Sequence, residues 1–189
     1  MDQISSMEEK DDAEIIELVP ADKEFFGVLI RRYERRIIFY IRRISGGTDE
    51  EIEDLAQNIF LKAYVYLNSF RPGENFSSWL YGIAHNECID HWRKNKKHSG
   101  TISLEASANL LVILQSDEDI SGEFQKKWTS EIVQKAISAL PFKYREIIVL
   151  RFLEDKSYEE IAQILQKPVS TVGTLVRRAK ELIKEIIQQ

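Results

Sequence analysis

Several features that would place a protein in common classes are scarce or missing from this chain. A single cysteine among 189 residues excludes an internal disulfide framework and fits a reducing compartment. The longest apolar run, residues 110–114, is far too short to cross a bilayer, and no apolar signal stretch stands at the amino terminus. We therefore expect a soluble, cytoplasmic protein with no membrane insertion.

Signatures of catalysis are also missing. No Gly-rich phosphate loop, nucleophile elbow or pair of carboxylates stands out, so we expect neither an enzyme nor a cofactor. His85-Asn86-Glu87 matches the H-x-E of zinc nucleobase deaminases, but that pattern needs a later P-C-x-x-C and the chain has no second cysteine. His85, Cys88 and His91 also drift around a helix rather than sharing one face. We expect no metal site.

The charge is unevenly distributed along the chain. The net charge is −5, but residues 1–24 hold nine acidic residues against two lysines, so this leader carries −7 and the remainder +2. Because phosphate neutralisation supplies most of the non-specific affinity for DNA, a body this weakly basic is expected to bind free DNA weakly. A role on DNA then needs a second source of affinity, such as a partner protein.

Apolar residues recur at helical spacing and no strand-like alternation persists, so we expect an all-α protein. It reads as two small helical domains joined by a flexible linker that is rich in Ser, Gly, Asn and acids. The expected order is a mobile acidic arm over 1–21, a helical domain over 22–97, the linker over 98–127 and a helix-turn-helix domain over 128–189. Helices of the first domain are expected from Asp22 to Ile44, from Thr48 to Leu67 and, capped by Ser77, to Lys96.

The segment after Ser157 predicts a helix-turn-helix. Ser157 and Glu160 form a capping box that opens a short helix, and Pro168 breaks it before a second helix at Ser170 or Thr171. Apolar residues line one stripe of the second helix, whereas its other faces carry hydrogen-bond donors. Such a helix after a tight turn is what reading the major groove requires. Helical hairpins also occur in all-helical domains that do not bind DNA, so this segment alone does not decide between the two functions.

Two surfaces of the first domain suggest partners. Aromatic residues in and beside the loop over 68–75 precede a basic helix end at 93–97, which suits unstacked bases because each stacked base contributes about 1–3 kcal/mol. The alternative is that the aromatics are core and the lysines form a solvated helix end favoured by the macrodipole. Leu61 and Val65 are apolar on an outer helix face, which indicates a docking surface, although single exposed apolar residues are common.

Three stretches are specific when they occur in this order: D-L-A-Q-N-I-F-L-K-A-Y at 54–64, F-S-S-W-L-Y-G-I-A-H-N-E-C-I-D-H-W-R at 76–93 and L-P-F-K-Y-R-E-I-I-V-L-R-F at 140–152. They are followed by Y-E-E-I-A-Q-I-L and S-T-V. With them the chain resembles the bacterial RNA polymerase sigma factors, in particular the small extracytoplasmic-function (ECF) group. The resemblance leaves out the arm and the linker.

The resemblance implies a dissociable subunit that binds core RNA polymerase and promoter DNA to direct transcription initiation. The polymerase-binding residues would be Asp54, Gln57, Asn58, Phe60 and Leu61. Recognition and melting of the −10 element would fall to Phe70, Arg71, Asn75, Phe76, Trp79, Asn86, Asp90, Arg93 and Lys94. The −35 element would be read by Ser170, Thr171, Thr174, Arg177 and Arg178. The family is often held by an anti-sigma factor, which is therefore a further expected partner.

The chain departs from the family pattern at a few positions. The family usually has a basic residue where Gly173 stands, and often another where Leu175 stands, so −35 contacts are expected to shift to neighbouring donors. Gly82 replaces a commonly long basic side chain. Glu87 stands where an apolar residue is usual, and we expect the middle of this helix to pack differently.

Two other functions stay open on the residues alone. A stand-alone regulator would combine the helix-turn-helix with a sensory helical domain and would bind duplex DNA tightly without polymerase. An anti-sigma-like adaptor would bind polymerase or a sigma factor and would have no use for Arg177 and Arg178.

Overall fold

The computed structural model describes residues 10–71, 73–94 and 130–188, and over these ranges it is helical without strands, which confirms the all-α class. The linker predicted over 98–127 lies outside the described residues. The elements are α2 (Asp12–Leu18), α3 (Glu24–Ser45), α4 (Asp49–Tyr66), a 3-10 turn η1 (Leu67–Ser69), α5 (Phe76–Lys94), α8 (Ser130–Ala139), α9 (Phe142–Ile148), a π-helical segment η2 (Val149–Leu153), α10 (Tyr158–Leu165) and α11 (Val169–Gln188).

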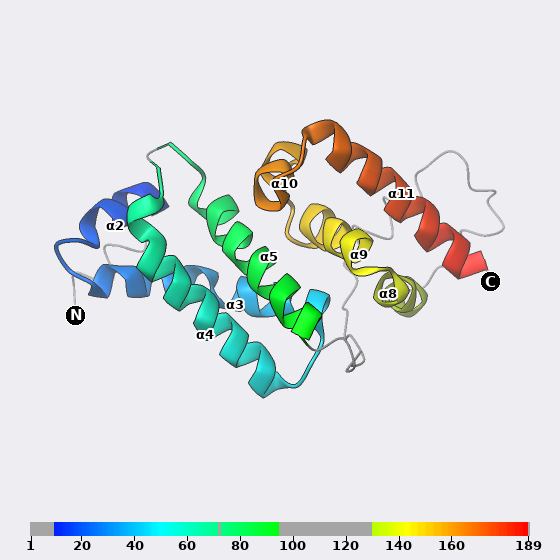
Figure 1. Cartoon of the computed structure of the whole chain (residues 1–189), viewed down its shortest axis with the longest axis horizontal. Coiled ribbons are helices and arrows are strands. Elements are labelled where there is room, and N and C mark those ends of the chain that lie inside the picture. The colour runs from blue at the N-terminus through cyan, green and yellow to red at the C-terminus, as the bar shows by residue number, and fades with distance from the viewer. Residues whose placement is uncertain (1–9, 72, 95–129, 189) are drawn as a thin grey trace.

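The N-terminal module, α2 to α5, is built around α3 (Figure 1). α3 ends at Gly46, whose φ of 64° is a conformation that glycine adopts without penalty. Thr48 then opens α4 through the predicted capping box with Glu51. Fully buried residues such as Ile37 on α3 and Ile59 on α4 form the core that these helices share with α5. The two helices therefore form where the hydrophobic spacing predicts them.

The prediction of a mobile arm is wrong for residues 12–18, which form α2. Asp11 and Glu14 make a reciprocal capping box at its start, and Ile15 is completely buried against the core. Asp12 accepts hydrogen bonds from Arg32 and from the Tyr33 hydroxyl on α3. The acidic composition concealed this helix, although Val19 is also buried and Arg32 donates to the Lys10 carbonyl as well.

The start of α5 also differs from expectation. Asn75 is the capping residue, since its side-chain oxygen accepts the backbone N–H of Ser78 at 2.9 Å. Ser77 lies in the first turn of the helix and is buried. Its hydroxyl is therefore available for a partner outside its own helix end.

The C-terminal module comprises α8 to α11. The helix-turn-helix is confirmed: Ser157 and Glu160 cap α10, Gln166 adopts the left-handed conformation at φ 50°, and α11 starts at Val169. The predicted apolar stripe of α11 faces inward, with Val172 and Ile183 among its buried members. Residues 154–156 connect η2 to α10. This connection contacts the N-terminal module through Glu154 and Lys156.

The two modules pack directly on one another. α10 packs against α5 (Figure 1), and α9 and η2 contact α3. The N-terminal and C-terminal helices share one continuous buried cluster. Two helical modules were predicted from the sequence, but this contact between them was not.

Candidate functional site

The outer face of α11 carries the polar residues predicted to read DNA. Their exposure is confirmed for all five positions, namely Ser170, Thr171, Thr174, Arg177 and Arg178. Further along the same face stand two acids, Glu181 and Glu185, and Arg178 forms ion pairs with both, at 3.0 and 3.2 Å. Acids repel phosphates, so the donor-rich N-terminal half of α11 is the part suited to a groove.

Gly173 does not lie on this outer face. A β-carbon built there would meet the Tyr158 ring of α10 at 3.7 Å, an ordinary packing distance. Gly173 thus sits at the α10–α11 contact, and a long side chain at this position would have to pass over Tyr158. The side chain that this position can hold is therefore limited by the packing of the two helices.

Three aromatic rings form a cluster where the loop 68–75 meets α5. The ring centroids of Phe70, Phe76 and Trp79 lie 5.6–5.7 Å from one another, and Phe76 also contacts Tyr33 edge-on at 5.6 Å. Phe76 is buried, whereas Phe70 and Trp79 are half-buried. Phe76 therefore packs on the core side of the cluster, and the Phe70 and Trp79 rings offer its accessible apolar surface.

Polar residues continue this surface along α5. Asn86, Asp90 and Arg93 are exposed and recur at helical spacing after Trp79, while Arg71 is exposed in the loop. The remaining predicted −10 residues have structural positions of their own: Asn75 caps α5, and Lys94 is its last residue.

Glu87 shows how the middle of α5 accommodates an unusual charge. Its carboxylate accepts a hydrogen bond from the Lys62 ammonium of α4, which raises the pKa of that ammonium, and the side chain is mostly covered. The charge at this position thus bridges α4 and α5.

The predicted docking face of α4 is confirmed as an exposed surface except at one position. Asp54, Gln57 and Asn58 are exposed, and Leu61 leaves 61% of its surface in solvent. Phe60 is largely buried instead, and only an edge of it is accessible, in the groove between α3 and α4. A large apolar side chain follows the helical period inward here, as the core requires.

A groove of about 480 Å³ runs between α3 and α4 beside this face. Leu61 and Phe60 line it together with apolar residues of α3 that sequence reasoning did not single out. The lining residues of the groove are Phe26, Ile30, Glu34, Ile38, Glu53, Ala56, Gln57, Phe60, Leu61 and Tyr64. Val65, 60% exposed, extends the apolar surface by one helical turn. The arrangement suits a partner that presents an apolar ridge with polar edges.

Cys88 and His85 have structural roles. His85 contacts the Glu146 carboxylate through Nδ1 at 2.6 Å, and Cys88 is completely buried. Among the described residues, no three His, Cys, Asp or Glu side chains are grouped as metal ligands. The described part of the chain also contains no helix with the length and apolarity needed to cross a bilayer.

Cys88 is expected to be chemically silent in the native protein. Burial raises the pKa of its thiol to about 12, so the reactive thiolate is scarce at pH 8 and reagents have no access. Native protein should leave Ellman's reagent unreacted over the period in which urea-unfolded protein releases one equivalent. A Gln163→Cys variant, with an exposed second thiol, serves as the positive control. Rapid native labelling of Cys88 would contradict its buried position.

Comparison with known proteins identifies this arrangement. Residues 29–98 match Sigma-70 region 2, and residues 130–183 match Sigma-70, region 4. The ECF RNA polymerase sigma factor SigW of Bacillus subtilis is 35% identical over 173 residues, which cover 87% of this chain and 89% of the relative. The chain belongs to the ECF sigma factors of RNA polymerase. The sigma-E factor of Escherichia coli is a further relative, 31% identical over 88% of both chains.

Solved structures of low sequence identity share the fold. CnrH, in complex with the cytosolic domain of CnrY, superposes with a TM-score of 0.67 at 20% identity, covering 94% of this chain and 97% of that one. The sigma factor RpoE of Bartonella quintana, in complex with the anti-sigma factor NepR, gives 0.61 at 24% identity over 88% of this chain and 98% of that one. As an ECF sigma factor, the chain is a transcription regulator whose two matched regions mediate promoter recognition and initiation.

Proposed function

We propose that this sigma factor binds core RNA polymerase through the groove and outer face of α4, and places α5 on the −10 element and α11 on the −35 element. Membership of the sigma family carries this proposal, and three separate exposed surfaces on the matched regions support it. Core polymerase and promoters would place its action in the cytoplasm, and it would need no catalytic residue of its own. We further propose the domain limits 22–97 and 128–189 for the two functional units.

The polymerase surface is proposed on the basis of its shape and chemistry. An exposed leucine beside an apolar groove gives the anchor that protein interfaces bury, and the neighbouring Asp54, Gln57 and Asn58 give it a polar rim. A sigma factor with a nearly neutral body needs this contact because phosphate neutralisation alone supplies little affinity. Core polymerase would then deliver two weak DNA-binding surfaces to the same promoter.

The aromatic cluster is proposed to receive an unpaired base of the −10 element. Phe70 and Trp79 offer accessible ring surface, and the exposed Arg71 and Arg93 lie along the path of a strand backbone. The predicted roles of Asn86 and Asp90 in the same path are part of this proposal.

Trp79→Ala is expected to impair promoter opening more than initial promoter binding, because the ring acts on melted DNA. Removing one stacking partner weakens the open complex by about 1–3 kcal/mol. Permanganate reactivity of −10 thymines, measured with core polymerase, would fall by about fivefold or more while closed-complex binding in the cold stays near normal. Tyr66→Ala, which removes an exposed aromatic ring from the end of α4, is the matched control. Normal melting by Trp79→Ala would contradict the assignment.

The first test of the proposal is assembly. Purified protein and core polymerase should form a complex in a pull-down and give run-off transcripts from a cognate promoter, whereas the protein alone should give weak gel shifts. Tight, polymerase-independent binding of duplex DNA would favour a stand-alone regulator instead. Because the RpoE structure holds the anti-sigma factor NepR as its partner, an anti-sigma factor is also proposed for this chain.

A further inference from the structure

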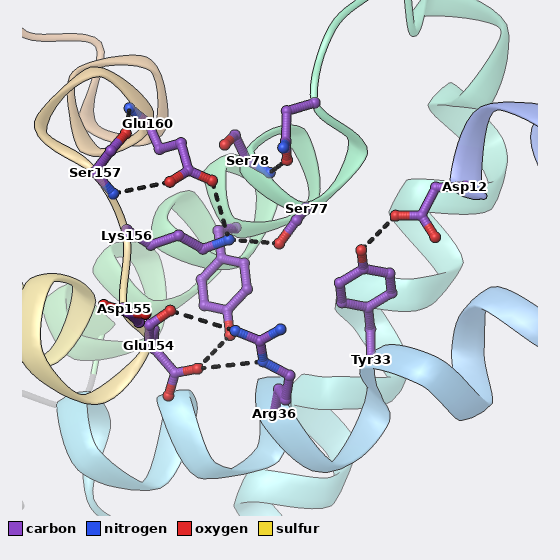
Figure 2. A network of polar contacts seen from close by, with 12 residues as sticks. Asp12, Tyr33, Arg36, Ser77, Ser78, Glu154, Asp155, Lys156, Ser157 and Glu160 are labelled. Carbon is purple, nitrogen blue, oxygen red and sulfur yellow. Dashed lines mark hydrogen bonds and ion pairs between the residues drawn. The ribbon is translucent and has the colours of Figure 1, made fainter. Parts of the chain in front are cut away.

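A buried polar network joins the two modules. Glu154, in the connection before α10, is only 5% exposed, and its carboxylate accepts hydrogen bonds from Tyr81 of α5 at 2.6 Å and from Arg43 of α3 at 2.9 Å. Arg36 of α3 adds an ion pair at 3.7 Å (Figure 2). A carboxylate of the C-terminal module is thus held by three groups of the N-terminal module.

Two further charges of the C-terminal module make similar contacts. The Lys156 ammonium, 5% exposed, donates to the Ser77 hydroxyl of α5 at 2.6 Å (Figure 2). The Glu146 carboxylate, 2% exposed, accepts from the Tyr40 hydroxyl at 2.7 Å and contacts His85 at 2.6 Å. Glu146, Glu154 and Lys156 therefore anchor one module to the other through hydrogen bonds of good length.

Close packing surrounds this network. A β-carbon added to Gly82 of α5 would lie 3.8 Å from the Ile164 carbonyl oxygen of α10, so the absence of a side chain lets the two helices approach. At the other end of α5, the Trp92 ring lies 5.6 Å from that of Phe142 on α9. The contact thus extends along most of α5.

Burying the charges of this network costs free energy, which makes it easier for the two modules to separate. Burial raises the pKa of Glu154 in spite of Arg43 and Tyr81, and burial lowers the pKa of Lys156. Both charges are disfavoured by the loss of water, and a buried ion pair generally gains little net stability over solvated partners. Removing one member alone is costly, however, because its partner then stays buried and uncompensated. Such a contact favours one docked arrangement of the two modules, and the modules can still separate when all of its charges return to water together.

If the proposed function is accepted, the docked arrangement holds α5 and α11 too close together to reach both promoter elements. Ile164 contacts Gly82 on α5, and Ser170 on α11 follows six residues later, a reach of at most about 22 Å. Elements centred at −10 and −35 are about 85 Å apart along B-form DNA at 3.4 Å per base pair. The segment 95–129 is long enough, at about 120 Å fully extended, to let the modules separate.

We propose that Glu146, Glu154 and Lys156 form an intramolecular latch that docks the C-terminal module on α3 and α5 in the free protein. The latch keeps α5 and α11 together, and it opens before the two promoter elements are bound. The docking rests on the contacts of the chain alone, whereas its consequence for transcription rests on the proposed function.

Fluorescence transfer in the isolated full-length chain tests the latch. Dyes on Glu74→Cys and Gln163→Cys report closure, because both exposed positions lie within a few residues of the α5–α10 contact and buried Cys88 does not compete for label. The parent should show high transfer that does not depend on protein concentration. Glu154→Lys should lose it, because an ammonium then faces Arg36 and Arg43. Glu159→Lys makes the same charge change at an exposed position of α10 and should keep high transfer.

A second pair of variants opens the contact without altering the charges. Gly82→Trp places a large ring against α10 and should lower transfer, whereas Gly82→Ala fits the available distance and should not. Far-UV circular dichroism confirms that each variant is folded. Low transfer in the parent, or high transfer in both folded Glu154→Lys and Gly82→Trp, would overturn the latch.

Transcription separates the latch from the proposed function. If the closed form is about 90% populated, Glu154→Lys should reach half-maximal run-off transcription at about tenfold lower protein concentration than the parent. Unchanged half-maximal concentration, with transfer lost, would overturn the coupling of opening to promoter use. If the parent protein does not bind polymerase but shows high fluorescence transfer, the proposed function is refuted and the docking of the modules still stands.

Discussion

Leu61→Asp is expected to weaken binding to core RNA polymerase by at least about 30-fold. Leu61 is the most exposed large apolar side chain of the described residues and lines the groove between α3 and α4. Truncating an interface anchor costs about 2 kcal/mol or more, and an aspartate adds the cost of burying a charge. Because the side chain contributes little to the core, the variant should remain folded. Affinity can be measured by titrating fluorescently labelled protein with core enzyme.

The matched control is Val169→Asp, an exposed apolar residue at the start of α11. It makes the same kind of change in the C-terminal module and should leave polymerase affinity within about twofold. Val65→Asp, one helical turn beyond Leu61, should have an intermediate effect. Equal affinity for the parent and Leu61→Asp would remove α4 from the polymerase interface.

Local sequence patterns predict the helices well because each pattern acts within one element. Capping boxes at Thr48 and Ser157 place helix starts to the residue, and the apolar stripe of α11 predicts its buried face. The positions outside this stripe form the outer face of α11, and the predicted −35 residues, which occupy them, are all exposed. The α4 positions predicted to contact a partner are exposed as well, with Phe60 as the exception. Phe60 follows the helical period inward, and its accessible edge lines the groove.

The contact between the modules was not predictable in the same way. Glu154 and Lys156 stand in a short connection between helices, where charged residues are ordinarily solvated. Their partners lie on helices more than 70 residues earlier, and nothing in local spacing pairs them. Glu146 gives a partial signal, because it stands directly before the apolar run 147–150, where a carboxylate drawn into the core requires a buried partner. α2 escaped prediction for a related reason, since the partners of Asp12 and Ile15 lie on α3 and local spacing does not reveal them.

The departures from the family pattern acquire physical reasons from these contacts. Gly82 lies where α10 approaches α5, and Gly173 lies where α10 meets α11, so both missing side chains border the same helix. α10 is therefore packed closely on two sides. The charge at Glu87 bridges α4 and α5 instead. Gly173 offers DNA no side chain, so −35 recognition is expected to rest on the polar residues of the outer face of α11.

Arg177 and Arg178 are therefore expected to differ, although they are adjacent and identical. The Arg178 guanidinium is held between Glu181 and Glu185, whereas Arg177 is 77% exposed and forms a longer ion pair with Glu181, at 3.7 Å. Arg177 can thus turn to a base or phosphate at little cost, while Arg178 must leave two carboxylates. Arg177→Ala should weaken −35-dependent promoter binding by about 1–3 kcal/mol, or about 5- to 150-fold. Arg178→Ala should have a clearly smaller effect.

Holoenzyme binding to a promoter with an intact or a randomised −35 element measures the difference. If Arg177 reads a base, its loss reduces the preference for the intact element, whereas a phosphate contact lowers affinity for both DNAs and makes binding less dependent on salt. Lys184→Ala removes one positive charge further along α11 and controls for net charge. A larger defect for Arg178→Ala than for Arg177→Ala would mean that Glu181 and Glu185 position the guanidinium for DNA rather than compete with it.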